Sequence, residues 1–271
     1  MNREITCCHD LHVHTNLSFC APRTTTAESY LELCAEDGIR RIGFTNHIYT
    51  PEQLGVADPG HLHYALKIRE ELAAADRYPV QVLVGCEVET FYGQPPGLKP
   101  EAAAAFDYVL LAASHIFNQM HAYSHMDLST PDKVRELLLE QFRRACMLPY
   151  ELPTGICHPL YPVCCPFEQE VVDGITDSQL KECFSLAAER HRSIEIHACL
   201  FRPSTALDAD GLSPSYLRIL AAAKACGCRF HFGSDVHAPE GFAAAHRKLE
   251  LAARKLGITE ADLWSVAQDP L

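Results

Sequence analysis

The chain has 271 residues, of which 48% are hydrophobic, and it carries a formal net charge of -12. This size and apolar content predict a folded protein with a substantial core, and no segment approaches the roughly 18 apolar residues of a membrane helix. The acidic balance disfavours binding to nucleic acid or to an anionic membrane, but it is compatible with a small phosphorylated substrate, because bound metal ions can reverse the sign of a pocket.

Short apolar segments typical of buried strands alternate with helical patterns along the chain. The helix starts are marked by capping residues, such as a threonine or serine followed by proline. In chain order we expect a strand near 4–11, a helix from Thr26 to Ala35 that stops before Gly38, a strand near 41–45, a helix near 61–76, strands near 80–87 and 107–113, a helix opening at Thr130-Pro131, a strand near 153–157, a helix near 176–191, a strand near 193–197, a helix from Ser213-Pro214 to Gly227, a strand near 229–234 and a helix near 239–256.

Strands that alternate with helices in this way predict an α/β fold with a mainly parallel sheet. At this length we favour a relative of the (β/α)8 barrel over an open, doubly wound sheet, built as a single domain over residues 1–271. In such a barrel the C-terminal ends of the strands meet at one face, and that face carries the chemistry.

Every expected strand ends in an imidazole or a carboxylate. A single histidine in such a place would ordinarily be a hydrogen-bonded core or surface residue, but the succession along the chain indicates one shared site. In chain order these residues are His12 and His14, His47, Glu87, His115, His158, Glu195 and His197, and Asp235 and His237.

This set of residue types predicts a metal centre. Alternate side chains of a strand point the same way, so both imidazoles of His12-Val13-His14 can reach one site. Imidazole and carboxylate ligands suit zinc, manganese or iron. Four ligands satisfy one zinc ion, so the larger set suffices for two or three divalent ions if a carboxylate such as Glu87 bridges them. Clustered ions polarise a phosphoryl or carbonyl oxygen and supply a hydroxide nucleophile, which predicts a hydrolase.

The cysteines and the first residues suggest a cytoplasmic protein. The 13 cysteines are scattered without any Cys-x-x-Cys pair, so we interpret most of them as reduced, buried thiols rather than as a zinc ribbon. The segment Met1–Glu4 lacks the pattern of a signal peptide.

The order of the motifs resembles the PHP (polymerase and histidinol phosphatase) family. The resemblance spans residues 10 to 240 and depends on the order and spacing of the motifs rather than on any one of them. The matching segments are Asp10-Leu11-His12-Val13-His14, Thr45-Asn46-His47, Gly85-Cys86-Glu87, Ser114-His115, Cys157-His158-Pro159 and Gly233-Ser234-Asp235-Val236-His237.

The resemblance implies a distorted (β/α)7 barrel, similar to a TIM barrel, that holds up to three metal ions and hydrolyses phosphoesters. The length of the chain resembles the stand-alone histidinol-phosphatase branch, in which an arginine seven residues after the glutamate of the sixth strand binds phosphate; here that spacing leads from Glu195 to Arg202. The implied ligand sets are His12, His14, Glu87 and Asp235 for one ion, Glu87, His115 and His158 for a second, and His47 and His237 for a third.

Four positions depart from the family pattern. Cys20 stands where the family often has a histidine ligand of the third ion, so either a thiolate replaces that ligand or the third ion is weakly held. Asn46 replaces an acid before His47. His197 stands where asparagine is common, and it either adds a ligand or hydrogen-bonds the substrate. The arginine that histidinol phosphatases carry shortly after the fifth-strand histidine is missing from 159–165.

We therefore expect a metal-dependent phosphoric monoester hydrolase in which a metal-bound hydroxide attacks a small phosphorylated metabolite and Arg202 neutralises charge. The candidates for the remaining catalytic roles, including protonation of the leaving group, are His197, Asp235 and His237. Two alternatives stay open: an amide or lactone hydrolase on the same barrel, and a non-enzymatic metal-binding or regulatory protein. A silent Arg202→Ala would favour the first, and purified protein without metal would favour the second.

Overall fold

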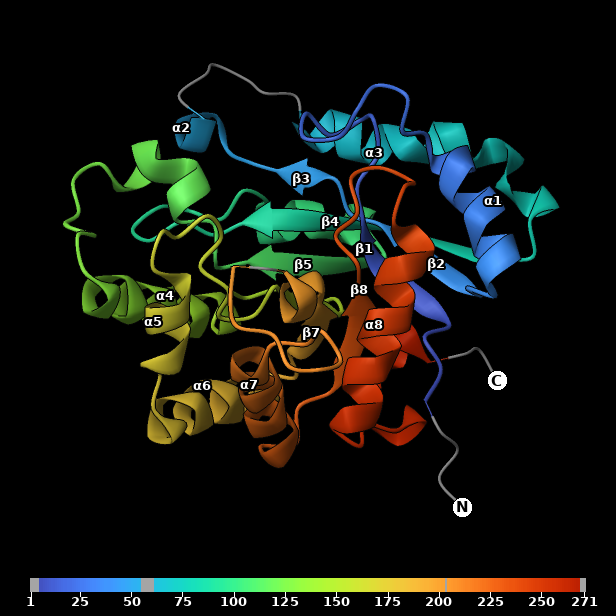
Figure 1. Cartoon of the computed structure of the whole chain (residues 1–271). Helices are drawn as coiled ribbons and strands as arrows, with labels where there is room; N and C mark the ends of the chain where they lie inside the picture. Colours follow the sequence, from blue (N-terminus) through green and yellow to red (C-terminus); the bar gives the residue numbers. More distant parts are fainter. Residues whose placement is uncertain (1–4, 55–60, 203, 269–271) are drawn as a thin grey trace.

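A computed structural model describes residues 5–54, 61–202 and 204–268 of the chain, and Figure 1 shows a central set of strands surrounded by helices. The strands in the described ranges are β1 (His9–Val13), β2 (Arg41–Phe44), β3 (His47–Ile48), β4 (Gln81–Glu89), β5 (Tyr108–Ala112), β6 (Thr154–Cys157), β7 (Ser193–His197) and β8 (Phe230–Gly233). The α-helices there are α1 (Ala27–Asp37), α2 (Pro51–Leu54), α3 (His61–Glu71), α4 (Pro131–Cys146), α5 (Glu168–Asp173), α6 (Asp177–Glu189), α7 (Pro214–Ala225) and α8 (Phe242–Lys255).

The strands form a nearly closed parallel barrel in the order β1-β2-β4-β5-β6-β7-β8. The two-residue strand β3 pairs with β4 further along than β2 does, so β2 and β3 are two parts of one interrupted strand. The chain after β8 returns to β1, where the amide of Asp235 donates to the carbonyl oxygen of His12 at 2.8 Å and the amide of His14 donates to that of Val236 at 3.1 Å. The predicted seven-stranded barrel is confirmed.

Side chains complete the seam between β8 and β1. The backbone amide of Phe232 donates to Nε2 of His9 at 3.0 Å, and that of Ser234 donates to Oδ1 of Asp10 at 3.1 Å. The other oxygen of Asp10 contacts Nε2 of His246 in α8 at 2.8 Å. Asp10 therefore joins three elements at the seam.

The first strand lies later in the chain than the prediction over 4–11. A turn in which the amide of Cys8 donates to the carbonyl oxygen of Thr6 precedes it, and the strand runs over His9–Val13. His12 therefore lies within β1 rather than at its end. Similarly, β4 continues two residues beyond Glu87 to Glu89.

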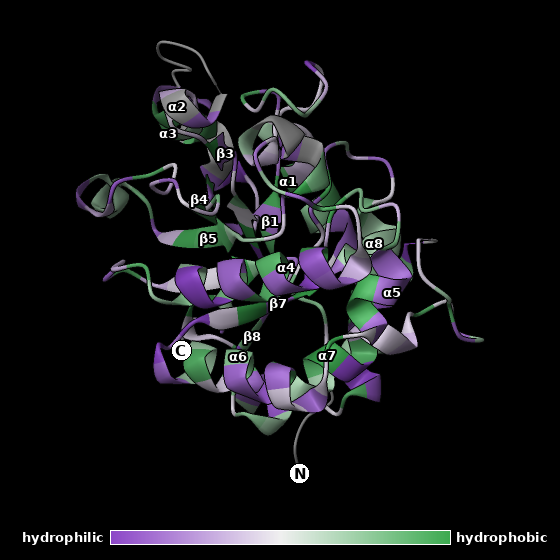
Figure 2. Ribbon diagram, turned by 90° about the vertical axis from the view of Figure 1, so that its left-hand side faces the viewer, coloured by the Kyte–Doolittle hydropathy of each residue, from purple (hydrophilic) through white to green (hydrophobic). Residues whose placement is uncertain are grey.

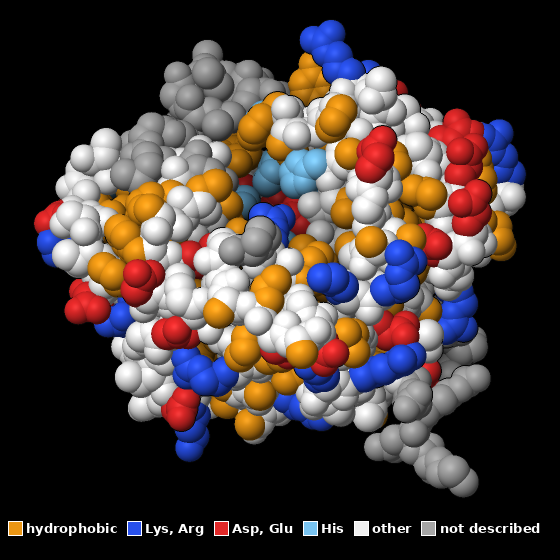
Figure 3. Space-filling view, in the orientation of Figure 1, with side chains coloured by type: hydrophobic (Ala, Val, Ile, Leu, Met, Phe, Trp, Pro, Cys, Tyr) orange, Lys and Arg blue, Asp and Glu red, His pale blue; other side chains and the backbone are white. Residues whose placement is uncertain are grey.

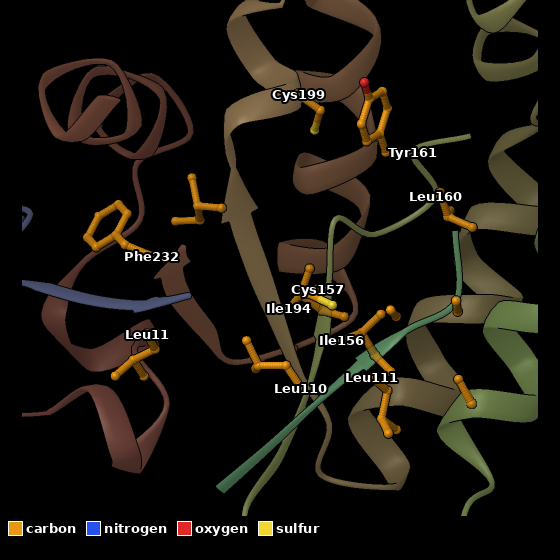
Figure 4. Packing of buried hydrophobic residues seen from close by; sticks show 14 of the residues in the cluster. Leu11, Leu110, Leu111, Ile156, Cys157, Leu160, Tyr161, Ile194, Cys199 and Phe232 are labelled. Atoms are coloured by element: carbon orange, nitrogen blue, oxygen red, sulfur yellow. The ribbon is translucent and has the colours of Figure 1, made fainter. Parts of the chain in front are cut away.

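The barrel core consists of strand residues that are buried on both faces. Figure 4 shows Leu110, Leu111, Ile156 and Ile194 packed together there. Across the interior, the hydroxyl of Tyr108 in β5 donates to the carbonyl oxygen of Leu11 in β1 at 2.7 Å. The ring passes so close to β2 and β4 that a Cβ at Gly43 or Gly85 would overlap it.

The helices that open at the predicted capping residues begin where the sequence predicts, whereas the short helices α2 and α5 were not predicted. The hydroxyls of Thr26, Thr130 and Ser213 accept hydrogen bonds from the first turns of α1, α4 and α7. Figure 2 shows hydrophilic and hydrophobic residues interspersed along α4 and α6, as expected for helices that bury one face against the barrel. None of the helices in the described ranges combines the length and the apolar character that crossing a membrane would require.

Candidate metal centre

The side chains predicted to bind metal lie together at the C-terminal ends of the barrel strands. Figure 3 shows histidine side chains at the bottom of a hollow, with hydrophobic side chains around it and a Lys or Arg side chain beside it. The side chains of His12 and His14 are inaccessible to solvent, whereas that of His237 is 34% exposed at the rim. The residues brought together are His12, His14, Cys20, His47, Glu87, His115, His158, Asp235 and His237.

The first group of donors consists of His12, His14, Glu87 and Asp235. The Nε2 atoms of His12 and His14 are 3.1 Å apart. Oε2 of Glu87 lies 3.5 and 3.3 Å from these two nitrogens, and Oδ1 of Asp235 lies 3.6 and 3.2 Å from them. Donors bound at 2.0–2.1 Å to a tetrahedral ion are separated by about 3.3–3.4 Å, so these five separations are close to those expected around one such ion.

Glu87 also faces a second group of donors. Its Oε1 atom lies 2.8 Å from Nε2 of His158 and 3.9 Å from Nε2 of His115. Its Oε2 atom is buried and lies 2.8 Å from Nδ1 of His47, in addition to the two Nε2 atoms of the first group. The two oxygens of Glu87 thus face different groups of imidazoles, so this carboxylate could contribute a donor atom to each of two ions.

A third group combines a thiol with imidazoles. The donor atoms of His14, Cys20, His47 and His237 all lie within 4.8 Å of one another. The ring of His14 stacks on that of His47 and on that of His237, with centroids 4.6 and 4.4 Å apart. The sequence alone leaves the role of Cys20 open, and the structure places its thiol beside these imidazoles.

Three buried residues outside the predicted ligand set hold the imidazoles. Glu195 contacts Nδ1 of His12 at 2.7 Å, and Glu89 contacts Nδ1 of His47 at 3.0 Å and Nδ1 of His115 at 2.8 Å. The hydroxyl of Ser114 contacts Nδ1 of His158. Such partners fix the ring orientation and tautomer of metal-binding histidines. The signal for Glu89 was available, because Glu87 and Glu89 lie two residues apart and therefore on the same face of β4.

Two residues of the centre have backbone conformations that are uncommon outside glycine. The φ angles of His158 and Asp235 are 31° and 54°. The amide of His158 donates to Oε2 of Glu195 at 2.6 Å, and the amide of Asp235 donates to the carbonyl oxygen of His12. These hydrogen bonds hold conformations that cluster at functional sites.

The carboxylates and imidazoles of the centre shift each other's protonation. Burial alone would raise the pKa of Glu87, but the charges of His47 and His12 outweigh burial and hold that pKa well below its usual range. Burial alone would lower the pKa of His12, but the charges of Glu195, Asp235 and Glu87 raise it well above its usual value. The Glu87 carboxylate is therefore ionised and available to bind a cation, whereas binding of a cation by His12 has to displace a proton from its imidazole.

His197, Arg202 and Tyr161 form a separate polar group beside Asp235. Nδ1 of His197 accepts a hydrogen bond from the amide of Cys199 at 3.0 Å, so its Nε2 atom carries the proton and points to Oδ2 of Asp235 at 3.3 Å. The guanidinium of Arg202 lies 3.7 Å from the same oxygen and donates to the hydroxyl of Tyr161 at 3.3 Å. Sequence analysis missed Tyr161, which is buried in the segment where the expected second arginine is absent.

Comparison with known proteins gives one family and two solved structures of interest. The family model for the PHP domain matches residues 10–196. A histidinol phosphate phosphatase from Lactococcus lactis subsp. lactis Il1403, solved in complex with zinc, L-histidinol and phosphate, superposes with a TM-score of 0.65 at 16% sequence identity and covers 93% of this chain and 95% of that chain.

A protein from Listeria monocytogenes assigned as a histidinol phosphatase superposes with a TM-score of 0.62 at 15% identity, covering 89% of this chain and 99% of that one. No curated protein sequence matches the chain. At identities of 15 and 16%, the two solved structures support the fold of this chain, whereas the family model supports a shared evolutionary origin with PHP domains.

Proposed function

Because this chain belongs to the PHP domain family, we propose that it is a metal-dependent phosphoesterase that hydrolyses a small phosphorylated metabolite. The observation that carries the proposal is the convergence of imidazoles and carboxylates from most strands of the barrel on Glu87, next to the partly exposed guanidinium of Arg202. Sequence analysis predicted this activity and a cytoplasmic location, and the location stays a prediction.

The donor set supports a centre for two or three divalent ions of zinc, manganese or iron. His12, His14, Glu87 and Asp235 would hold one ion, and Glu87 with His115 and His158 would hold the next. Bound ions of this kind polarise a phosphoryl oxygen and activate water at neutral pH. The outer carboxylates Glu89 and Glu195 would keep the imidazole nitrogens aimed at the ions.

Arg202 and Tyr161 would bind the phosphoryl group. Oδ2 of Asp235 lies 3.7 Å from Arg202, so an oxygen anion next to the ion group can also reach the guanidinium. The ring of Tyr161 lies under that guanidinium, with 5.5 Å between Cζ of Arg202 and the ring centroid, and this contact restricts the guanidinium. A phosphate bound there would therefore contact the guanidinium of Arg202 and the phenolic hydroxyl of Tyr161.

His197 would orient the substrate rather than protonate the leaving group. Burial lowers the pKa of His197 to about 4, so the ring is neutral at pH 7, and its Nε2–H group donates a hydrogen bond without carrying a second proton. Asp235 and His237 are the other candidates for proton transfer to the leaving alkoxide, but Asp235 is ionised: burial alone would raise its pKa, and the charge of His12 outweighs burial and holds that pKa well below its usual range. Of these two, His237 lies at the solvent-exposed rim, where a leaving group would depart.

A phosphatase screen tests the proposal. Protein loaded with zinc or manganese should release inorganic phosphate from at least one small phosphate ester, with L-histidinol phosphate in the panel, and chelated protein should not. Failure of fully loaded protein to hydrolyse any phosphate ester would overturn the proposal.

Replacement of Arg202 separates phosphate esters from amide or lactone substrates. Arg202→Ala should lower kcat/KM for a phosphate ester by about 100-fold or more, the usual effect of removing one preorganised donor to a developing anion. Steady-state kinetics on the same ester would measure the change, with Arg190→Ala, at an exposed position, as the matched control. An unchanged kcat/KM would favour an amide or lactone hydrolase instead.

A further inference from the structure

The third donor group differs in chemistry from the other two. Glu87 and Asp235 supply oxygen donors to the first two groups, whereas the third contains the sulfur of Cys20 with the imidazoles of His14, His47 and His237. We propose that Cys20 is a metal ligand and that this position selects a thiophilic divalent cation such as zinc, while the carboxylate-rich positions also accept harder cations such as manganese. The inference rests on the metal centre of the proposed function and adds a selectivity within it.

The allocation of imidazoles leaves a complete set of donors around Cys20. Nε2 of His14 lies 3.1 Å from Nε2 of His12 and 3.3 Å from Glu87, so His14 belongs with the first ion. Cys20, His47 and His237 then remain for the third position. Zinc binds both cysteine sulfur and histidine nitrogen, and a site with three protein ligands leaves one position for water or substrate.

The loop between β1 and α1 holds Cys20 over the imidazoles. At its base, the amide of Thr15 donates to Oδ1 of Asn46 at 2.9 Å. At its other end, the amide of Asn16 donates to the carbonyl oxygen of Thr25, whose hydroxyl donates to the carbonyl oxygen of His237. Asn46, which replaces the expected acid, thus anchors the loop that carries the thiol.

Neighbours of Cys20 also fit a thiolate ligand. The hydroxyl of Ser18 lies 3.2 Å from Sγ of Cys20, within reach for a hydrogen bond to a metal-bound sulfur. Phe19 is 63% exposed, yet its ring stacks on those of His47 and His61 at centroid distances of 5.7 and 5.6 Å. These ring contacts help to hold the loop against His47 and therefore keep the thiol of Cys20 close to the imidazoles.

Soft and hard donors prefer different cations. Thiolate ligands favour zinc over manganese, whereas carboxylates accept both. The centre is thus expected to bind one zinc ion that excess manganese does not displace, beside positions where manganese exchanges freely. The thiol proton passes to solvent when the cation binds.

Cobalt substitution tests the ligand directly. The full chain, stripped of metal and titrated with Co²⁺, should show a thiolate-to-cobalt charge-transfer band in the near ultraviolet. Cys20→Ser should abolish the band and lower zinc affinity at one position by more than about tenfold, since even loss of an outer partner of a ligand costs that much. Cys20→His should restore the metal content without the band, and Cys164→Ser, at an exposed cysteine, should change neither.

Cys157 provides the critical comparison, because its thiol lies close to His12 and His158. A band that persists in Cys20→Ser, or that disappears in Cys157→Ala instead, would overturn the proposal, as would cobalt-saturated protein without any band. These readouts need no turnover, so an inactive protein that keeps the band would contradict the proposed phosphatase activity and leave the thiolate site standing.

A second measurement requires no variant. In the unaltered chain, zinc should slow alkylation of Cys20 by iodoacetamide by at least about tenfold, because metal binding removes the free thiolate that reacts. Magnesium should not protect Cys20, and neither ion should protect Cys164. Equal alkylation of Cys20 with and without zinc, located by peptide mass spectrometry, would contradict the proposal even if the serine variant failed to fold.

Discussion

At the scale of single residues, the centre is organised in two layers around Glu87. The inner layer consists of the side chains whose donor atoms face the hollow. The outer layer consists of Glu89, Glu195 and Ser114, which contact the Nδ1 atoms of the inner imidazoles and fix their orientation. Glu195 has a double role, because one of its oxygens contacts Nδ1 of His12 and the other accepts the amide of His158. One carboxylate therefore orients a ligand from β1 and the backbone that follows β6.

Glu195→Gln should weaken metal binding without unfolding the chain. An amide has one oxygen, so its NH₂ group must face either the amide of His158 or the proton on Nδ1 of His12, and one hydrogen bond is lost. We expect zinc affinity to fall by about 10- to 100-fold, as for other outer partners of metal-binding histidines. Competition with a chromophoric chelator measures this, with exposed Glu189→Gln as the matched control. Identical affinities for both variants would remove Glu195 from the outer layer.

The two layers differ in how far the sequence predicts them. The candidate ligands follow from their residue types and their order at strand ends, and the structure brings them together. Serine and tyrosine are common residue types, and Ser114 and Tyr161 contribute through contacts with residues distant in the sequence, His158 and Arg202. No local sequence pattern therefore identifies them. Glu89 was detectable from its spacing to Glu87, and it was missed because the strand was expected to end at 87.

At the scale of elements, strand β5 shapes the barrel interior through one aromatic side chain. Tyr108 spans the interior from β5 to the carbonyl oxygen of Leu11, beneath glycines in β2 and β4. The glycines at 43 and 85 provide the space that the ring occupies. Strands β1 and β5 were predicted from their apolar content. Nothing in the sequence of β5 indicates that Tyr108 contacts β1, which lies three strands away in the barrel.

Gly43→Ala should destabilise the fold by about 1–3 kcal/mol, the usual cost of overpacking a core. The added methyl would overlap the Tyr108 hydroxyl first, whereas a methyl at Gly85 would overlap the ring itself. Tyr108→Phe should therefore reduce the cost of Gly43→Ala but not that of Gly85→Ala. Urea unfolding of the single and double variants measures these couplings. Additive costs at both glycines would contradict this packing.

At the scale of the whole molecule, the barrel closes where the candidate metal ligands lie. Hydrogen bonds across the seam join His12 to Asp235 and His14 to Val236, and Asp10 ties the same place to α8. The sequence predicted the parallel barrel from its alternation of strands and helices. It did not predict the interruption between β2 and β3, because the two parts are recognisable only by their shared partner β4.

Metal removal should therefore destabilise the whole barrel rather than a single loop. A ligand at 100 times its Kd stabilises the native state by about 2.7 kcal/mol, so zinc should raise Tm by about 5–10 °C over chelated protein. Thermal unfolding followed by circular dichroism measures the shift. Arg202→Ala should keep the shift, and Glu87→Gln should lose most of it. A Tm that changes with neither zinc nor chelator would show that metal binding is not linked to folding.

The seam also sets an order of events during synthesis. During synthesis His12 and His14 leave the ribosome before Asp235, His237 and the strand that brings them to β1, which lie more than 200 residues further along the chain. A nascent chain can thus hold several imidazoles long before it can form the first ion's ligand group. Binding of an ion by the first donor group therefore requires that β8 has already paired with β1, whatever the supply of that ion.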